Sequence, residues 1–246
     1  MPLHQIFNEA PRTFGSDDYT FRARLGSLVN GRPMAHDTWR FTSGDHLVID
    51  DLVEAYGGER KEWDTKSEEI YETLSTVKSL DIILESLRSE YVLWGRGNAP
   101  IRTCDGITQT DDSKSPCACA QQSANLADWK AAAKAGTACQ PTVKASFRLA
   151  DNPDLGLGRF QSSSWGLAMG DPSWTADKMT DGRIWQPPIG DLEETLADHG
   201  GRAMATLDVV GVEFTTRAGK NVSYTKPQLT ITGPVPEVVN ALLGAA

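Results

Sequence analysis

All four cysteines of this 246-residue chain fall within one short window, at Cys104, Cys117, Cys119 and Cys139. The surrounding residues 95–142 are rich in Gly, Ser, Asp and Ala and hold few large apolar side chains, so they cannot build a sizeable core of their own. Four thiolates complete the tetrahedral shell of a structural zinc ion, and binding such an ion folds a segment that lacks a core. The pattern therefore predicts that these four cysteines hold a structural zinc ion.

The spacing leaves other interpretations of the cysteines open. The middle pair is Cys-x-Cys, one residue tighter than the Cys-x-x-Cys pair that is common in zinc sites. Gly106, Pro116 and Gly136 nevertheless permit the sharp turns that ligation needs. Two disulfides, or four buried thiols without a ligand, are the alternatives. A catalytic zinc ion is not expected, because four thiolates leave no position for water.

The redox compartment bears on this choice. The longest apolar runs are only a few residues, far short of the about 20 that a transmembrane helix needs. The first fifteen residues lack the basic region and the apolar stretch of a signal peptide. We therefore expect a cytoplasmic protein, in which thiols stay reduced and clustered cysteines favour a metal over disulfides.

The net charge of −9 is concentrated in one part of the chain. Residues 41–90 hold 13 acidic and 5 basic residues, a local balance of −8. Duplex DNA repels such a surface, since non-specific DNA binding depends on phosphate neutralisation by Lys and Arg. The charge therefore argues against a free-standing DNA binder. Either an acidic face docks on a basic partner, such as a DNA-binding protein, or it is a solvated surface that aids solubility.

Period-two alternation of apolar residues predicts several strands. The residues that alternate in this way are Phe21, Ala23 and Leu25; Trp39 and Phe41; Leu80, Ile82 and Leu84; Phe147 and Leu149; and Leu207, Val209, Val212 and Phe214. Residues 91–94 predict a further strand, separate from that at 80–84. Asn30-Gly31 predicts a turn between the first two strands. Gly211 predicts a bulge, because the alternation changes phase there.

Helical spacing of apolar residues predicts a helix that ends at Tyr56. Asp45 suits its N-cap, because the carboxylate accepts from free backbone N–H groups, and Gly57 suits the position that stops it. Residues 125–135 and 236–243 predict two further short helices.

These elements together predict an α+β protein, mainly antiparallel β-sheet with few short helices and a zinc-stabilised insert of four cysteines. We expect three parts: an α+β body at 1–94, a zinc-binding insert at 95–142, and a β-rich C-terminal part at 143–246. The first and last parts can form one domain.

The sequence offers no constellation typical of an enzyme. The four histidines are His4, His36, His46 and His199, and none forms a His-Glu-x-x-His metal motif. His36 and Asp37 resemble a turn, and His46 falls in the first turn of the predicted helix, where an exposed side chain is the ordinary outcome. No nucleotide-binding glycine loop is present, and the Ser-Trp-Gly stretch at 162–166 lacks the leading glycine of a hydrolase elbow. We therefore expect a protein without catalytic activity.

Tryptophans near turn-like sequence suggest partner binding instead. Trp94, Trp165 and Trp174 lie beside glycines or Arg96, and Trp, Tyr and Arg are the preferred anchors of protein interfaces. Ordinary core packing is the alternative for each of them.

Several of these pieces, in this order, resemble one family: the recombination directionality factors of phage large serine integrases, especially the long form found in Streptomyces phages. The matching stretches are GRPMAHDTWRFTSGD at 31–45, EAYGGERKEWD at 54–64, YVLWGRGNAPIRTCDG at 91–106, PCAC at 116–119, CQPT at 139–142, and SFRLADNPDLGLGRFQSSSWG at 146–166. The resemblance covers roughly residues 20–170, and the tail beyond matches much less clearly.

The resemblance implies a function without chemistry. A directionality factor binds a large serine integrase on attachment-site DNA, activates excision between the prophage ends and inhibits integration. Such a protein would act in the cytoplasm of the bacterial host, with little or no direct DNA binding and no membrane. Two other interpretations remain: a zinc-containing accessory protein of phage nucleic-acid metabolism, which would bind single strands through aromatic side chains, and a metal-dependent hydrolase with an open zinc position.

Overall fold

We describe the fold from a computed structural model. It places residues 19–29, 32–63, 65, 67–95, 99–110, 114–119, 126–171, 186–216 and 219–244. Among these, no helix has both the length and the apolar character needed to cross a membrane. The predicted Asn30-Gly31 turn, Trp174, Arg96 and His4 lie outside the described residues.

The described chain is mostly strand. The strands are β1 (Phe21–Val29), β2 (Arg32–Ser43), β3 (Lys61–Glu62), β4 (Tyr71–Leu74), β5 (Ser79–Trp94), β6 (Pro100–Cys104), β7 (Gln140–Leu149), β8 (Gly158–Ser162), β9 (Ala203–Thr215) and β10 (Asn221–Pro234). The helices are α2 (His46–Tyr56), α4 (Leu126–Lys134), α5 (Trp165–Met169), α6 (Ile189–Asp198), α7 (Glu237–Leu242) and the short 3₁₀ helix η2 (Pro153–Leu155).

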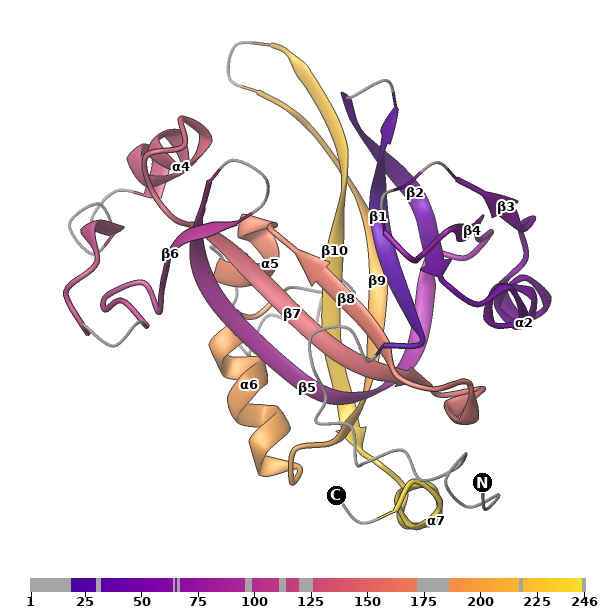
Figure 1. The fold of residues 1–246 in the computed structure, drawn as a ribbon. Coiled ribbons are helices and arrows are strands. Elements are labelled where there is room, and N and C mark those ends of the chain that lie inside the picture. The colour runs from indigo at the N-terminus through magenta and orange to yellow at the C-terminus, as the bar shows by residue number, and fades with distance from the viewer. Residues whose placement is uncertain are drawn as a thin grey trace, which may run out of the picture.

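All ten strands belong to one sheet, with the order β10-β9-β5-β7-β8-β1-β2-β4-β3 and with β6 paired to β5 (Figure 1). Every pairing is antiparallel except that of β1 with β8, which is parallel. This confirms the predicted α+β class with mainly antiparallel strands and short helices. The order places strands that are distant in sequence side by side, since β9 lies beside β5 and β8 beside β1.

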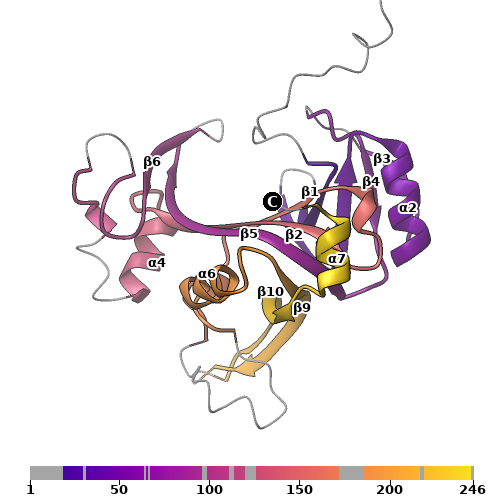
Figure 2. The ribbon, with the colours of Figure 1, turned by 90° about the horizontal axis from the view of Figure 1, so that it is seen from below.

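The sheet is strongly curved, so that strands distant in its order come together. Figure 2 shows α2 at one end of the curve, β6 and α4 at the other, and α6 with the β9–β10 hairpin beside β5. The Thr225 hydroxyl of β10 donates to the carbonyl of His36 in β2 at 3.2 Å. The Trp39 indole N–H likewise donates to the Lys78 carbonyl just before β5, at 3.2 Å. The curvature encloses one core.

Of the residues that the structure describes, 27 are buried in that core. Its centre is aromatic: Phe21 meets both Phe41 and Phe147 edge to face, with ring centroids 6.0 and 5.8 Å apart, and Trp39 meets Phe160 at 5.6 Å. Edge-to-face contacts of this kind stabilise beyond the area they bury, by about 0.5–1.5 kcal/mol each. The predicted alternation is confirmed for these strands, because the apolar members face this core.

Helix α2 forms as its caps predict. The Asp45 carboxylate accepts from the Leu47 N–H at 2.9 Å. At the other end Gly57 adopts φ 75°, a left-handed conformation that favours glycine. The buried face carries Val48, Ile49, Leu52 and Tyr56. The helix at 125–135 is also confirmed, as α4, and the C-terminal one as α7.

Residues 91–94 form strand as predicted, but two details of the predicted strands were wrong. Residues 91–94 do not form a separate strand, because β5 continues without a break from Ser79 to Trp94. The apolar pattern is interrupted at Glu85, where a register shift between Leu84 and Ser86 moves the side-chain phase and brings Leu87 into the core. His36 and Asp37 likewise lie inside β2 rather than in a turn.

The bulge predicted at Gly211 was also wrong. Gly211 pairs with Thr225 in an unbroken register, and the shift in this hairpin lies instead between Ile231 and Gly233. With no bulge, the change of apolar phase has a different consequence. Leu207 and Val209 face the core, whereas Val212 and Phe214 emerge on the opposite face of the hairpin.

Candidate metal centre

Strand pairing places two of the four cysteines at opposite edges of β5. Cys104, the last residue of β6, pairs with Tyr91 on one edge. Pro141, near the start of β7, pairs with Tyr91 on the other edge, and Cys139 directly precedes β7. Neighbouring strands are about 4.8 Å apart, so β6 and β7 bring Cys104 and Cys139 close together near the end of β5. We call residues 100–139, from β6 to Cys139, the cysteine insert.

A hydrogen-bonded loop returns the chain to the end of β5. The Asp105 carboxylate accepts from the N–H groups of Ile107 and Thr108 at 2.8 and 2.7 Å. Gly106 lies against the Tyr91 ring and has a φ of 100°, a backbone conformation that residues other than glycine rarely adopt. The Cys117 N–H then donates to the Ile107 carbonyl at 2.7 Å. The loop therefore holds Cys117, and Cys119 after it, against the strand ends.

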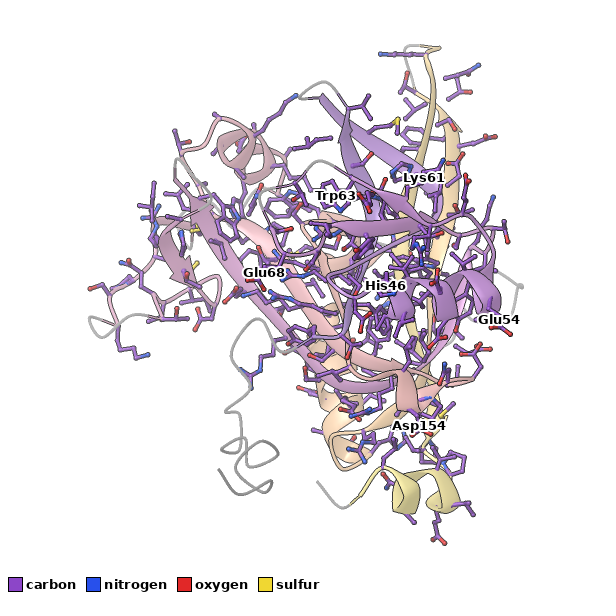
Figure 3. All side chains as sticks on the ribbon, turned by 45° about the vertical axis from the view of Figure 1, so that its right-hand side comes forward. His46, Glu54, Lys61, Trp63, Glu68 and Asp154 are labelled. Atoms are coloured by element: carbon purple, nitrogen blue, oxygen red, sulfur yellow. The ribbon has the colours of Figure 1, made fainter. Side chains whose placement is uncertain are left out.

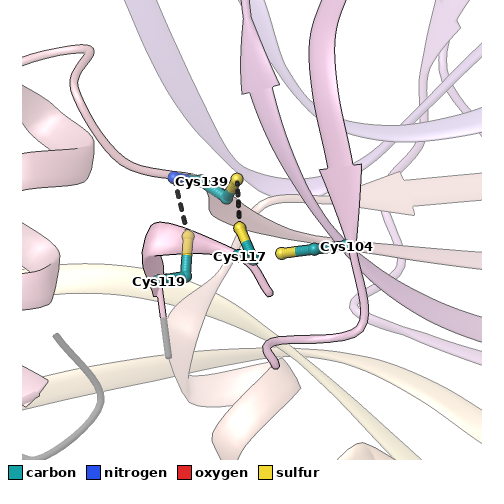
Figure 4. A group of neighbouring side chains, drawn as sticks. All are labelled: Cys104, Cys117, Cys119 and Cys139. Carbon is teal, nitrogen blue, oxygen red and sulfur yellow. Dashed lines mark hydrogen bonds between the residues drawn. The ribbon is translucent and has the colours of Figure 1, made fainter. Parts of the chain in front are cut away.

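The four thiols converge on one point (Figure 4). Their sulfur atoms all lie within 4.8 Å of one another, and the Cys117 and Cys139 sulfurs are 4.0 Å apart. All four residues are free of disulfides and at most 1% exposed. A tetrahedral zinc ion with bonds of about 2.3 Å holds its sulfurs roughly 3.8 Å apart. The cluster therefore fits such an ion after small movements.

Backbone N–H groups point at the sulfurs. The Cys139 N–H donates to the Cys119 sulfur at 3.3 Å, and the Gly106 and Cys119 N–H groups donate to Cys104 and Cys117. Burial raises the pKa of the Cys104 thiol, and it raises the pKa of Cys119 to about 12. Burial raises the pKa of Cys117, but hydrogen bonds from the Cys119 N–H and the neighbouring thiols outweigh burial and lower this pKa. Without a cation, four such close thiols cannot all ionise.

A guanidinium lies beside the thiols. Burial works against the charge of Arg102, but its hydrogen bond to Cys139 and the nearby charges of Cys139, Cys117 and Cys119 raise its pKa. A tetrathiolate zinc centre carries a net charge of −2, and a neighbouring cation that bonds a ligand sulfur offsets part of it. Arg102 is therefore suited to balance the centre.

Comparison with known proteins identifies the family. Residues 12–183 match the recombination directionality factor-like family, also described as Gp3-like. The chain belongs to this family. The match includes the whole cysteine insert and ends before α6, β9 and β10. No solved structure matches the chain. Membership supports a role in the control of recombination, and it implies interaction with a recombinase.

The aromatic wall of this directionality-factor-like protein was not predicted. Trp129 of α4 is buried against the cysteines, and its indole N–H donates to the Cys139 carbonyl at 2.8 Å. Tyr91 and Trp165 pack on Trp129 with ring centroids 4.9 and 5.2 Å away. Trp165, predicted as a partner anchor or a packing residue, thus packs beside the cysteines. The helical spacing of Leu126 and Trp129, one turn apart, was the available signal for the wall.

In this directionality-factor-like protein the four thiols form a closed set. Each cysteine offers one sulfur, all four are buried, and together they can supply the four ligands of a tetrahedral ion. The described histidines, His36, His46 and His199, take no part in the cluster, and the His46 side chain is 53% exposed, as its place in the first turn of α2 predicts. The arrangement can hold a metal and link three separate chain segments. It offers no vacant ligand position for a substrate.

Proposed function

We propose that this protein is a recombination directionality factor for a large serine integrase. It binds the integrase on attachment-site DNA, activates excision between the prophage ends and inhibits integration, without carrying out chemistry itself. The family match over residues 12–183 is the observation that carries this proposal. The setting that we propose is the cytoplasm of the bacterial host.

The proposed mechanism is a shift between synaptic arrangements of the integrase. A factor that binds one arrangement more tightly than another moves their balance only by that difference in affinity. A difference of about 2–3 kcal/mol changes the preference roughly 30- to 150-fold. A switch of direction therefore needs no catalytic group on the factor.

The charge distribution supports a protein partner rather than DNA. Helix α2 exposes Asp50, Asp51 and Glu54, and Glu68 and Asp154 are exposed as well. Figure 3 labels Glu54, Glu68 and Asp154. Part of this charge is compensated locally, since Asp50 pairs with Arg60. The remaining acidic surface repels phosphates and suits a basic partner that is itself bound to DNA.

We further propose that the metal is zinc and that its role is structural. Cys104, Cys117, Cys119 and Cys139 would be its ligands. Four sulfurs select soft or borderline metals, of which zinc prefers tetrahedral coordination. Bound zinc would connect β6, the loop at 114–119 and the start of β7.

Recombination in vitro tests the proposed function. The cognate integrase would be given plasmids that carry either the prophage ends or the original attachment sites, with and without this protein. Excision that depends on the protein, together with reduced integration, is the expected result. A mobility-shift assay with the protein alone serves as the control. Unchanged recombination together with salt-sensitive binding of single strands would replace this proposal with the nucleic-acid accessory function.

A further inference from the structure

The outer half of the β9–β10 hairpin extends beyond the rest of the sheet (Figure 1). We call residues 210–226 the arm. Near the base of the hairpin, Ala205, Leu207 and Val209 of β9 face the core. Along the arm the apolar residues occupy the other face, because the register stays regular through Gly211. The hairpin therefore reverses its apolar face where it leaves the body.

Four apolar side chains form a stripe on that face. Phe214 pairs directly with Val222, and Val212 pairs with Tyr224, so all four lie together on one side of the hairpin. Phe214 and Tyr224 are each 50% exposed. Val212 and Val222 are of intermediate exposure, so the two rings are the most exposed part of the stripe.

The opposite face of the arm is polar and turned toward the body. It carries Glu213, Ser223 and Thr225, and the Thr225 hydroxyl bonds the His36 carbonyl of β2. A hairpin evolved only to pack on the body would place its apolar residues on this inner face. The sequence does the reverse, so packing on the described body does not account for the stripe.

The charge of the arm also differs from that of the chain. Its segment holds three basic residues, Arg217, Lys220 and Lys226, and one acidic residue, Glu213, a balance of +2 against −9 overall. In the sequence Lys220 and Lys226 bracket the β10 part of the stripe. The Lys226 ammonium lies 3.1 Å from the Asp171 carboxylate, which fixes it at the base of the arm.

We propose that the stripe of Val212, Phe214, Val222 and Tyr224 docks on an apolar ridge of the recombinase that is flanked by acidic residues. Aromatic side chains that are half exposed and rigidly held are typical anchors of an interface. The exposed Lys220 beside them matches an acidic flank and steers the encounter. This inference rests on the proposed function. The arm lies outside the 12–183 family match, so the stripe gives this chain a means to distinguish its own recombinase from those of relatives.

The test compares two double variants of the full chain. F214S/Y224S removes both rings from the stripe, and E213Q/S223A changes the polar face at the same height on the hairpin. Binding to the purified cognate serine integrase on prophage-end DNA would be measured by interferometry. We expect the stripe variant to bind about 100-fold or more weakly, and the polar-face variant within about threefold of wild type. Melting temperatures check folding, and F214S alone serves if the double variant unfolds.

Lys220→Glu gives an independent readout of the flanking charge. We expect severalfold weaker binding through a slower association rate, and an effect that shrinks as salt rises.

The possible outcomes distinguish failure of the docking surface from failure of the proposed function. If F214S/Y224S folds and binds like wild type, the docking surface is wrong and the proposed function stands. If wild type binds no integrase, the proposed function fails and the docking surface falls with it. Sedimentation that shows a wild-type dimer split by F214S/Y224S would assign the stripe to a second copy. Stripe-dependent binding to DNA alone would assign it to nucleic acid. Both results overturn the proposal.

Discussion

The body of the sheet and the cysteine insert are stabilised by different means. The body buries 27 residues in one cluster that spans the curved sheet, α2, α5 and α6. The cluster in the insert has six buried residues, and four of them are cysteines. Hydrophobic burial contributes about 25 cal/mol for each Å² of apolar area removed from water. Buried apolar area can therefore stabilise the body, whereas the insert buries too little apolar area to be stabilised in this way.

The comparison shows how the two regions share one sheet without sharing one source of stability. β5 is the link, because its first half crosses the core and its last residues carry Tyr91 beside the cysteines. The body should keep its structure when the insert loses its own. The following experiments test that independence.

Loss of the proposed zinc ion should have the largest effect. Structural zinc contributes about 10–16 kcal/mol of binding free energy in small domains. Cys119→Ser should therefore reduce bound zinc from one ion per chain to near zero, as measured by mass spectrometry. Hydrogen exchange should lose its protection between β6 and Cys139 and keep it in β1 and β9. Equal loss of protection in β9 would show that the two regions are not independent.

Metal affinity should also rise with pH, because zinc binds thiolates and displaces protons. The raised pKa values of Cys104 and Cys119 mean that these protons are still bound at neutral pH in the free protein. Titration with zinc in two buffers of different ionisation enthalpy would count the released protons. No proton release would contradict ligation by these thiols.

Trp39→Ala should have the next largest effect, this time on the body. The indole is fully buried, contacts Phe160 and donates to the Lys78 carbonyl. Truncation of a buried Trp costs about 3–5 kcal/mol of unfolding free energy, measured by urea denaturation. The folded fraction should still bind one zinc ion. Leu47→Ala, at a 61% exposed position of α2, is the matched control and should change stability little.

A smaller effect is expected from Glu69→Gln. Burial raises the pKa of Glu69, but hydrogen bonds from Arg24 and Thr42 outweigh burial and hold this pKa below its ordinary value. The ionised side chain thus adds stability above about pH 4.5, and this is lost as the pH falls through the lower folded pKa. The variant should lose about 1–3 kcal/mol at pH 7. Urea midpoints should show a smaller loss on acidification than wild type; an unchanged acid slope would contradict this role.

The smallest effect on stability is expected from Trp129→Phe, and this effect should be limited to the cysteine insert. The ring is retained, but the hydrogen bond to the Cys139 carbonyl is lost. Loss of one such bond costs about 0.5–1.5 kcal/mol. Competition with a chelator should show a roughly two- to tenfold weaker hold on zinc, with the urea midpoint of the body unchanged. A shift of that midpoint would show that the aromatic wall also supports the sheet.

Local patterns were enough to predict some elements. Asp45 and Gly57 define the ends of α2, because caps depend on neighbouring residues alone. The cysteine cluster was predicted for a similar reason, because four thiols in one short stretch of sequence are expected either to bind a metal, to form disulfides or to be buried together. In both cases the deciding interaction is close in sequence.

The features that the sequence did not predict depend on contacts between residues that are distant in the chain. The continuity of β5 depends on β7, which takes up the shift at Ser86 across the sheet. The regular register at Gly211 depends on β10, and no local signal distinguishes a bulge there from a change of exposed face. The aromatic wall brings together Tyr91, Trp129 and Trp165 from three distant segments. Spacing along the chain cannot predict such a meeting.

The strand order also sets when each part can form on the ribosome. β5 is bordered by β7 and β9, and β9 is made only near the end of the chain. Ribosomes add about 5–20 residues per second, so one edge of β5 stays open for roughly ten seconds. All four cysteines lie between β5 and β9 in the chain, so they are made during that wait. A nascent chain can therefore take up metal before its sheet is complete, and zinc supply during synthesis would influence how many chains escape mispairing at the open edge.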